Sequence, residues 1–597
     1  MPEPPQVRWD LSALFESTTD PKIEETWRQA HARADAMSAK YRGRISSPDL
    51  TATRLLEAIR EAEELGQESS KPAIYANLLF AADSSNAEIG AFLAEQMEKS
   101  SEVRVKLMFL ELELQEADEK VVSELLKDPI LANYKHFIEN IRRFSAHRLS
   151  EKEEVLLEET ANTGSRAWVR LFEELTANHV FPYVNPETGE TEELTEHEVL
   201  ALLYEPERKV RLAAGTALHT GLKSLERTIC FIYNNLLADK KVEDRIRRYE
   251  YAEQSRHMSN ELDRAIVDLV VSLCRENYGL VERYYRVKRE MLGLPKLTFV
   301  DRYAPINEAK AQVSYEEAKE LVLRSFGEFS PEMRRRTEEF FDKGWIDAEP
   351  RPGKSGGAFC SYITPDTHPV ILLSYLNRMK DVGTLAHELG HGVHASFSRA
   401  QSLFNYHGTL PLAELASIFG EMLVFEELVK TASPTDKLAL YAEKVEGCFA
   451  SVFRQVAMYR FEQRCHQKRR EDGELAPEEF EEIWQEELQT MFGESVDLGD
   501  EHRNLWSYVG HFCFAPFYVY AYAFGELLTM ALYQKAKQEG PGFADKYQQL
   551  LELGGSKSPE DLMAIVGVDL RSREFWQGGL NAIEGLVAEV ETLWRSR

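Results

Sequence analysis

The chain has 597 residues, of which 71 are Lys or Arg and 100 are Asp or Glu, so its formal net charge is −29. A protein that binds a nucleic-acid backbone or an anionic membrane surface needs clustered positive charge, and basic residues form no extended run here, so we expect neither partner. Hydrophobic residues at 43% and charged residues at 29% are typical of a folded globular chain and exclude a disordered one.

Most of the chain predicts amphipathic helices, because apolar residues recur at spacings of three and four. The clearest such stretches are Pro21 to Ala39, Leu50 to Leu65, Ala87 to Ala117 and Glu151 to Thr163. Residues 179–194 instead contain two extended runs around an Asn-Pro-Glu-Thr-Gly turn and predict a β-hairpin. Thr195, with Glu198 three residues on, predicts the cap of the next helix. We therefore divide the chain into a helical region, 1–195, that ends in the hairpin, and a second region, 196–597, whose lobes share chain segments.

The stretch from Leu297 to Cys360 is predicted to be irregular, because glycine and proline interrupt the helical pattern there. Pro369 to Leu376 is a short β-prone run, and together these segments predict a small sheet beside the helices. The Gly-Lys-Ser-Gly-Gly sequence at 353–357 lacks the GxxxxGK[ST] pattern of a phosphate-binding loop. It is either a tight turn or a loop that a ligand backbone approaches closely.

The six cysteines are scattered without a CxxC pair, which argues against a disulfide framework or a cysteine-zinc cluster and favours a reducing compartment. Residues 1–10 lack the basic and then apolar pattern of a secretory signal, so we expect a cytoplasmic protein. Phe512 to Tyr533 contains a single charged residue, Glu526, but Pro516 and the many tyrosines favour a buried helix over a membrane span.

His387-Glu388-Leu389-Gly390-His391 forms an HExxH motif, expected by chance roughly 0.04 times in a chain with 15 histidines. On a helix, residues four apart share a face, so His387 and His391 can bind one metal ion. Glu388 flanks that ion and suits a base that takes a proton from a metal-bound water. Asp381 or Thr384 could cap this helix. The alternative is two surface histidines with no ion between them.

Catalytic zinc usually takes three protein ligands, so a third residue is required. The HExxHxxGxxH pattern is excluded, because His394 and Phe397 stand where glycine and histidine would be needed. Three ligands in one row on one helix cannot easily surround a tetrahedral ion, so His394 supports the site from outside, faces the substrate or simply packs.

A second predicted helix, Leu412 to Lys430, supplies two further carboxylates. Glu414 and Glu421 are seven residues apart and so share a helix face. A buried carboxylate needs a cation, and we expect Glu414 to be the third ligand. Glu421 either holds a metal-binding histidine or is a surface charge.

HELGH followed by AELASIFGEM resembles the oligoendopeptidase F branch of the thimet oligopeptidase family of zinc metallopeptidases. Other segments are also similar to the family, namely WDLSALF at 9–15, LTFVDRYAPI at 297–306, GKSGGAF at 353–359 and HFCFAPFYVYAY at 511–522. The resemblance therefore extends from residue 9 to about residue 526. It implies a mainly α fold in which two helical lobes enclose a deep substrate channel, with a small β-sheet beside the zinc-binding helices.

The same resemblance implies one Zn²⁺ per chain, held by His387, His391 and Glu414, with Glu388 as general base. It further implies a late histidine and tyrosines that bind the substrate carbonyl oxygen as it becomes negative. The matching residues are Tyr522, which fits best, and His511, Tyr518 and Tyr520. The resemblance also implies a sheet edge that pairs with the substrate backbone at Gly356, Gly357, Ala358 and Phe359.

We therefore expect a zinc-dependent endopeptidase that hydrolyses internal bonds of short unstructured peptides, as a monomer or small homo-oligomer. Two alternatives remain. A dipeptidyl carboxypeptidase of the same superfamily would remove C-terminal dipeptides in sequence. A non-catalytic helical peptide-binding protein is disfavoured, because Glu388 and both histidines of the motif are intact.

Overall fold

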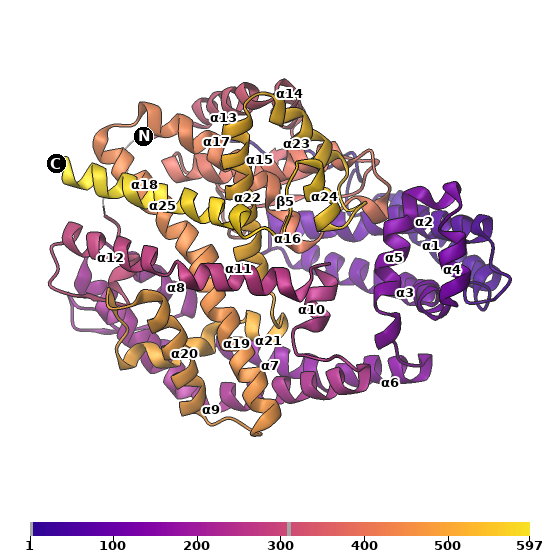
Figure 1. The fold of residues 1–597 in the computed structure, drawn as a ribbon, viewed down its shortest axis with the longest axis horizontal. Helices are drawn as coiled ribbons and strands as arrows, with labels where there is room; N and C mark the ends of the chain where they lie inside the picture. Colours follow the sequence, from indigo (N-terminus) through magenta and orange to yellow (C-terminus); the bar gives the residue numbers. More distant parts are fainter. Residues whose placement is uncertain (1–3, 307–311) are drawn as a thin grey trace. The chain divides into compact units, whose positions relative to one another are not determined.

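The computed structural model describes residues 4–306 and 312–597, which fold mainly as helices with small sheets, as the sequence predicts (Figure 1). The chain packs into two compact units, each assembled from three separate stretches. Unit 1 comprises Met1–Arg148, Lys310–Thr431 and Leu532–Leu570, and unit 2 comprises Leu149–Ala309, Ala432–Ala531 and Arg571–Arg597. The division predicted at residue 195 coincides with no limit of either unit, because unit 2 continues through that residue.

The elements of unit 1 are mostly helices, with one small sheet. They are α1 (Pro21–Tyr41), α2 (Ala52–Ala82), α3 (Ala87–Glu116), α4 (Glu119–Leu125), α5 (Lys135–Arg143), α13 (Tyr315–Phe329), α14 (Pro331–Asp342), β4 (Ile346–Asp347), β5 (Phe359–Ser361), β6 (Val370–Leu372), α15 (Met379–Ser398), α16 (Leu410–Ala413), α17 (Leu415–Thr431), α23 (Gly542–Glu552) and α24 (Pro559–Ile565).

The elements of unit 2 include a hairpin and a long central helix. They are α6 (Glu151–Ala161), α7 (Ser165–Ala177), β1 (Phe181–Val184), β2 (Thr191–Leu194), α8 (Glu196–Leu202), α9 (Arg208–Arg247), α10 (Gln254–Ser259), α11 (Arg264–Glu276), α12 (Gly279–Met291), β3 (Leu297–Thr298), α18 (Pro434–Cys448), α19 (Arg454–Glu471), α20 (Pro477–Phe492), β7 (Val496–Asp497), α21 (His511–Phe514) and α25 (Arg573–Arg595). A further helix, α22 (Tyr520–Glu539), begins in unit 2 and ends in unit 1.

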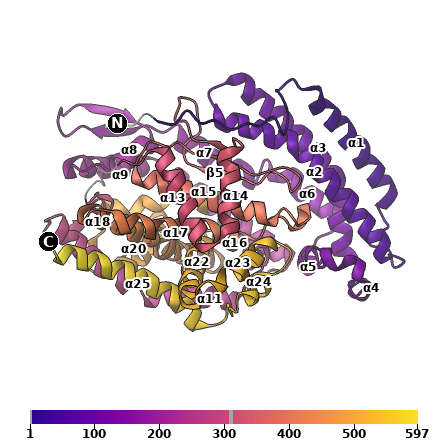
Figure 2. The same cartoon turned by 90° about the horizontal axis from the view of Figure 1, so that it is seen from above.

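Helices α1, α2 and α3 run side by side in unit 1 (Figure 2). Each begins where the sequence places a capping side chain, since Asp20, Thr51 and Asn86 accept hydrogen bonds from first-turn N–H groups. The buried Trp27 indole N–H donates to Gln96 at 2.7 Å and joins α1 to α3. Helix α2 continues well past the predicted end at residue 65, because its buried apolar face continues beyond that point.

The small sheet of unit 1 has the order β4-β6-β5, with β6 in the centre. Strand β4 is parallel to β6 and β5 is antiparallel to it. All three residues of β6 are buried. The run predicted at 369–376 therefore contains a strand, which covers only Val370–Leu372. Residues 315–342, which the sequence analysis assigned to an irregular region, instead form α13 and α14. The physical reason is local, because Ser314 with Glu317 makes a capping box and Ser330 caps the second helix.

The predicted hairpin is confirmed in unit 2, where Phe181 pairs with Leu194 and the two strands are antiparallel. Thr195 caps α8 with Glu198 in a capping box, also as predicted. The hairpin packs on α9 at Gly221, where an added Cβ would lie 2.2 Å from the Phe181 ring. A side chain at that position of α9 would therefore push the hairpin away.

Residues 512–533 form α21 and most of α22, separated by a turn at Pro516. Among residues 4–306 and 312–597, no helix combines the length and the apolar composition needed to cross a bilayer.

Candidate metal centre and active site

Helix α15 carries the HExxH motif and starts at Met379, earlier than predicted. Neither Asp381 nor Thr384 is its N-cap residue, so that prediction was wrong. Asp381 instead lies in the first turn, where its carboxylate accepts hydrogen bonds from the backbone N–H groups of Leu376 and Arg378 at 2.8 and 2.9 Å. From within the first turn, the Asp381 carboxylate thus provides an acceptor for backbone N–H groups just before the helix.

Helices α15 and α17 approach each other closely at a glycine. An added Cβ at Gly390 would lie 2.4 Å from the Ala416 carbonyl oxygen and 2.6 Å from the Ser417 Cα. At Gly420, on the facing helix, it would lie 3.3 Å from the Ala386 carbonyl oxygen. The fourth residue of the HELGH sequence therefore has a structural purpose, because only glycine lets the two backbones meet.

The helix predicted from Leu412 to Lys430 is broken at Glu414, which lies between the end of α16 and the start of α17. Ser417 donates a hydrogen bond to the Glu414 Oε2 atom at 2.7 Å and orients the carboxylate. Ser417 was not predicted as a site residue, although its position three residues after Glu414 on a helical segment places the two side chains together.

The structure brings His387, His391 and Glu414 together. Glu414 Oε2 lies 3.2 Å from His387 Nε2 and 3.4 Å from His391 Nε2. Zinc bonded to nitrogen and oxygen at about 2.0–2.1 Å in a tetrahedron separates its ligand atoms by about 3.3 Å. Within the described part of the chain, this is the group of side chains whose ligand atoms are close enough to hold a metal ion. The donor set and the spacing therefore fit zinc.

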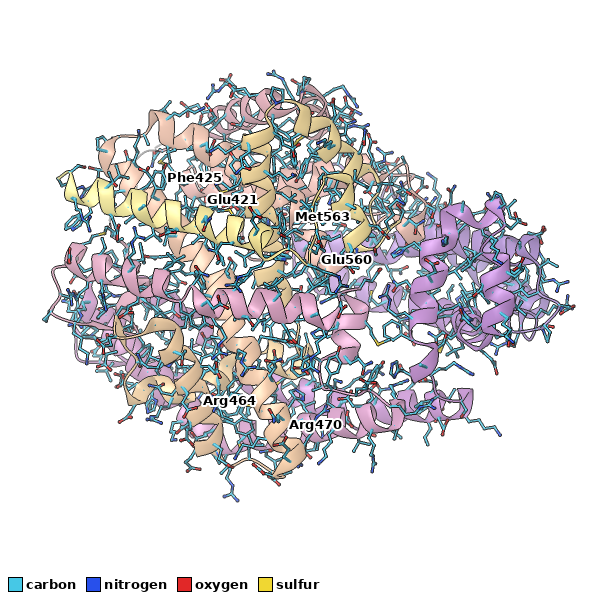
Figure 3. The ribbon with its side chains drawn as sticks, viewed as in Figure 1. Glu421, Phe425, Arg464, Arg470, Glu560 and Met563 are labelled. Carbon is cyan, nitrogen blue, oxygen red and sulfur yellow. The ribbon has the colours of Figure 1, made fainter. Side chains whose placement is uncertain are left out.

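Glu421 lies on α17, one turn before Phe425, and both residues are labelled in Figure 3. Its Oε2 atom is 3.4 Å from His387 Nδ1, so it is placed to fix the ring orientation and to leave Nε2 directed at Glu414. Burial alone would lower the pKa of His387, but the two carboxylates raise that pKa to about 10. Burial opposes ionisation of Glu414 as well, yet the two histidines hold its pKa well below the usual range. Such a site strongly favours positive charge.

Glu388 is outside this ligand group but next to it on α15. Its side chain is buried, and its Oε2 atom has no hydrogen-bond partner among the described residues. Burial raises the pKa of Glu388, while the two neighbouring histidines oppose that shift. A buried carboxylate with an open lone pair and a raised pKa is suited to exchange a proton with a bound water.

His394 is buried one turn beyond the motif and does not join the ligand group. Its ring lies 6.2 Å from the Tyr362 ring, and burial lowers the pKa of His394 to about 3, so it is neutral. Of the alternatives left open by the sequence, this placement favours packing.

The glycine-rich loop is held at one end and open in the middle. The Lys354 ammonium donates to the Asp347 carboxylate at 2.7 Å and to the Leu373 carbonyl at 2.6 Å, which ties the loop to the sheet. Gly356 and Gly357 are exposed, and no heavy atom lies within 4 Å of a Cβ added at either.

The loop leads through the half-buried Ala358 into Phe359, the first residue of β5. Strand β5 is an edge of the sheet and contacts α15, the metal-site helix.

Tyr362 and His407 were not singled out by the sequence analysis. Their rings stack at 4.9 Å in unit 1, and Tyr362 is near enough to Glu414 and Glu388 for both carboxylates to raise its pKa, after burial as the main cause. Tyr362 follows directly after β5, and no pattern in the sequence singles it out.

The late histidine and two of the tyrosines form a cluster in unit 2. His511 Nε2 lies 3.3 Å from the Tyr522 hydroxyl, and the Tyr518 ring is 5.2 Å from the Tyr522 ring. All three side chains are partly exposed. Tyr520 points elsewhere, since it is 2% exposed and its hydroxyl accepts a hydrogen bond from Asn260 at 2.8 Å. That burial argues against contact between Tyr520 and a substrate.

A mainly helical protein with an HExxH helix and a glutamate from the segment just before α17 is of the metallopeptidase class. The chain belongs to peptidase family M3, whose family model matches residues 201–582. A second model, described as oligopeptidase F, matches residues 113–181. The protein is therefore a peptidase.

Relatives of similar length are named as oligopeptidases, and solved structures of similar length share the fold. The chain is 27% identical to oligopeptidase PepF of Bacillus subtilis, over 98% of this chain and 87% of the relative. It is 27% identical to group B oligopeptidase PepB of Streptococcus agalactiae, over 98% and 97%. Its fold is similar to that of a putative peptidase from Chlamydophila abortus, with a TM-score of 0.85, 22% identity and 98% of both chains covered. It is also similar to oligoendopeptidase-F from Enterococcus faecium, with a TM-score of 0.73, 23% identity and coverage of 96% and 99%.

Proposed function

We propose that the protein is a zinc-dependent oligoendopeptidase that hydrolyses internal bonds of short, unstructured peptides. The observation that carries the proposal is the convergence of two imidazole nitrogens and one carboxylate oxygen at the ligand separations of a tetrahedral ion. His387, His391 and Glu414 would hold one Zn²⁺ and leave a fourth position open. Family membership supports the peptidase activity.

When bound, the zinc ion supplies Lewis acidity, which lowers the pKa of a water molecule to about 7 and polarises the scissile carbonyl. Glu388 takes the proton from the attacking water and returns it to the leaving amine. Glu421 holds the His387 ring through Nδ1. Tyr522, with Tyr518 and His511, donates hydrogen bonds to the carbonyl oxygen as it becomes negative. The clustering of these three side chains in unit 2 supports their common role.

The substrate backbone is proposed to add to the free edge of β5. An extended peptide gains main-chain hydrogen bonds by this mode of binding, and an edge strand is what it requires. The open backbone at Gly356 and Gly357 supports close approach, and Ala358 and Phe359 would continue the paired edge. A folded protein cannot offer such an extended strand, which favours short peptides as substrates.

Glu388→Gln tests the mechanism. We expect hydrolysis of an internally quenched peptide to fall by about 10²- to 10⁴-fold, because the amide cannot accept the proton. Zinc measured by mass spectrometry should remain near one ion per chain, because Glu388 is not in the ligand group. Glu320→Gln, on the exposed surface of α13, is the matched control and should leave both quantities unchanged. Near-normal hydrolysis by Glu388→Gln would refute the proposed role.

Peptides of graded length test the substrate class. We expect cleavage at internal bonds, loss of activity with a zinc chelator, and no cleavage of a folded protein. Stepwise release of C-terminal dipeptides would instead identify a dipeptidyl carboxypeptidase.

A further inference from the structure

The turn between α21 and α22 contains a backbone conformation that is unfavourable for its residue. Phe517 has φ = +58°, in the left-handed region, although it is not a glycine. Its side chain is fully buried, with its ring 4.5 Å from the His466 ring. A residue with a bulky side chain persists in this region only where the surrounding structure holds it. The turn lies between His511 and Tyr522, which form the cluster described above.

One peptide group of this turn is held at both of its polar ends. The N–H of Phe517 donates to Glu462 Oε1 on α19 at 2.8 Å. The carbonyl of Pro516, on the same peptide plane, accepts from Arg256 Nε on α10 at 3.2 Å. Because the two partners come from different helices, they fix the orientation of that plane. Tyr518 follows Phe517 in the chain, and the Arg256 guanidinium also lies 5.8 Å from the centre of the Tyr518 ring.

Glu462 is 0% exposed, and its second oxygen has no hydrogen-bond partner among the described residues. A buried carboxyl group that makes a single side-chain hydrogen bond is unfavourable for folding, so a role other than stability is needed to explain it. Glu462 lies on α19, the helix of Arg464 and Arg470 that are labelled in Figure 3, and contacts the turn through the Phe517 N–H.

The turn borders open space at Pro516. A cavity of about 510 Å³ within unit 2 is lined by Cys513, Phe514, Pro516 and Arg256 among others. Phe514 is 52% exposed. A backbone hydrogen bond from the Tyr518 N–H to the Ala515 carbonyl, at 3.0 Å, closes the turn, and the two side-chain hydrogen bonds and the buried Phe517 ring add to the restraints on the direction of the chain into Tyr518.

We propose that Arg256 and Glu462 are positioning residues that clamp the Pro516–Phe517 peptide group and thereby hold His511, Tyr518 and Tyr522 in one cluster. This inference rests on the proposed function for its effect on catalysis. Rotation of the clamped peptide would redirect Tyr518 and shift the start of α22, which carries Tyr522. Hydrogen-bond donors to a developing negative oxygen act in the transition state, so their misplacement lowers kcat more than it changes KM.

The experiment compares Glu462→Leu, which removes the acceptor, with Glu462→Gln, which keeps one. Burial raises the pKa of Glu462 to about 8, so a neutral amide is a close replacement. We expect Glu462→Leu and Arg256→Met to lower kcat by about 10- to 100-fold with KM within about threefold. Glu462→Gln should keep kcat within about threefold. Arg170→Met is the control, because Arg170 lines the same cavity but bonds Glu174.

Hydrogen exchange of the peptide 511–522 measures the clamp without reference to activity. We expect faster exchange in Glu462→Leu and Arg256→Met than in the wild-type protein, and wild-type exchange in Glu462→Gln and Arg170→Met. Equal loss of kcat in Glu462→Gln and Glu462→Leu, or unchanged exchange in Arg256→Met, would overturn the proposal. If Glu462→Leu does not fold, the partly exposed Arg256 still decides the question. Failure of the proposed function would appear separately, as hydrolysis by Glu388→Gln with the exchange result intact.

Discussion

Gly390→Ala should damage the metal site without altering any ligand. The new Cβ would lie 2.4 Å from the Ala416 carbonyl oxygen, whereas ordinary contact begins at 3.4 Å. To relieve this overlap, α15 and α17 must move apart by about 1.0 Å at this point. Backbone stands on both sides of the contact, so rotation of a side chain cannot relieve it. Glu414 precedes α17 and would move away from the two histidines.

The expected magnitude follows from two opposing effects. Alanine favours a helix interior over glycine by about 0.5–1 kcal/mol, whereas overpacking a tight contact costs about 1–3 kcal/mol. The net change is therefore a loss of up to about 2.5 kcal/mol in stability. Metal sites tolerate displacements of about 0.2 Å, so a shift near 1 Å should weaken zinc binding by at least about 10- to 100-fold.

Gly383→Ala is the matched control in the same helix. No heavy atom lies within 4 Å of a Cβ added at Gly383, so alanine there should stabilise the protein by about 0.5–1 kcal/mol. Zinc affinity is measured by competition with a chromophoric chelator, and stability by the thermal midpoint of the metal-free protein. Wild-type zinc affinity in Gly390→Ala would refute the argument that helix approach builds the site. So would equal effects of the two alanines.

Three further predictions concern single side chains. Glu414→Ala should lower zinc affinity much more than Glu421→Ala, because Glu414 contacts both histidines and Glu421 contacts one ring from behind; the reverse order would exchange their roles. Tyr522→Phe should lower kcat by about 10²-fold, while Tyr520→Phe should leave kcat unchanged and cost about 1 kcal/mol of stability. Burial raises the pKa of the Asp301 carboxyl group, but hydrogen bonds such as those from Arg208 outweigh it and hold that pKa at about 2. Its contribution to stability is present above pH 4 and is lost as pH falls toward 2, so the difference in thermal midpoint between wild type and Asp301→Asn should shrink over that interval.

Local features of this protein follow from the sequence because they depend on residues a few positions apart. The spacing of His387 and His391 places them on one helix face whatever surrounds the helix. Thr195 and Glu198 form a capping box from their own first turn. The hairpin before them depends on its turn residues. These features were predicted correctly for that reason.

Features that depend on distant parts of the chain needed the tertiary structure. Helical periodicity treats Glu414 and Glu421 alike, and the close approach at Gly390 places the first between the histidines and the second behind one ring. In the same way, Asn260 holds Tyr520 in the core, which its spacing in the aromatic segment does not reveal.

The clamp on the Phe517 peptide is the clearest case of this second kind. Its partners, Glu462 and Arg256, are 55 and 260 residues away in sequence from the groups they bond, and each unit is itself assembled from three stretches. Contacts across such separations depend on which chain segments pack together, because loop closure and burial of the whole unit outweigh any local preference. The sequence by itself therefore determined the chemistry of the motif and the helix that carries it. Tertiary packing decided which carboxylates stand beside the motif in unit 1, and which side-chain and backbone groups hold the tyrosines in unit 2.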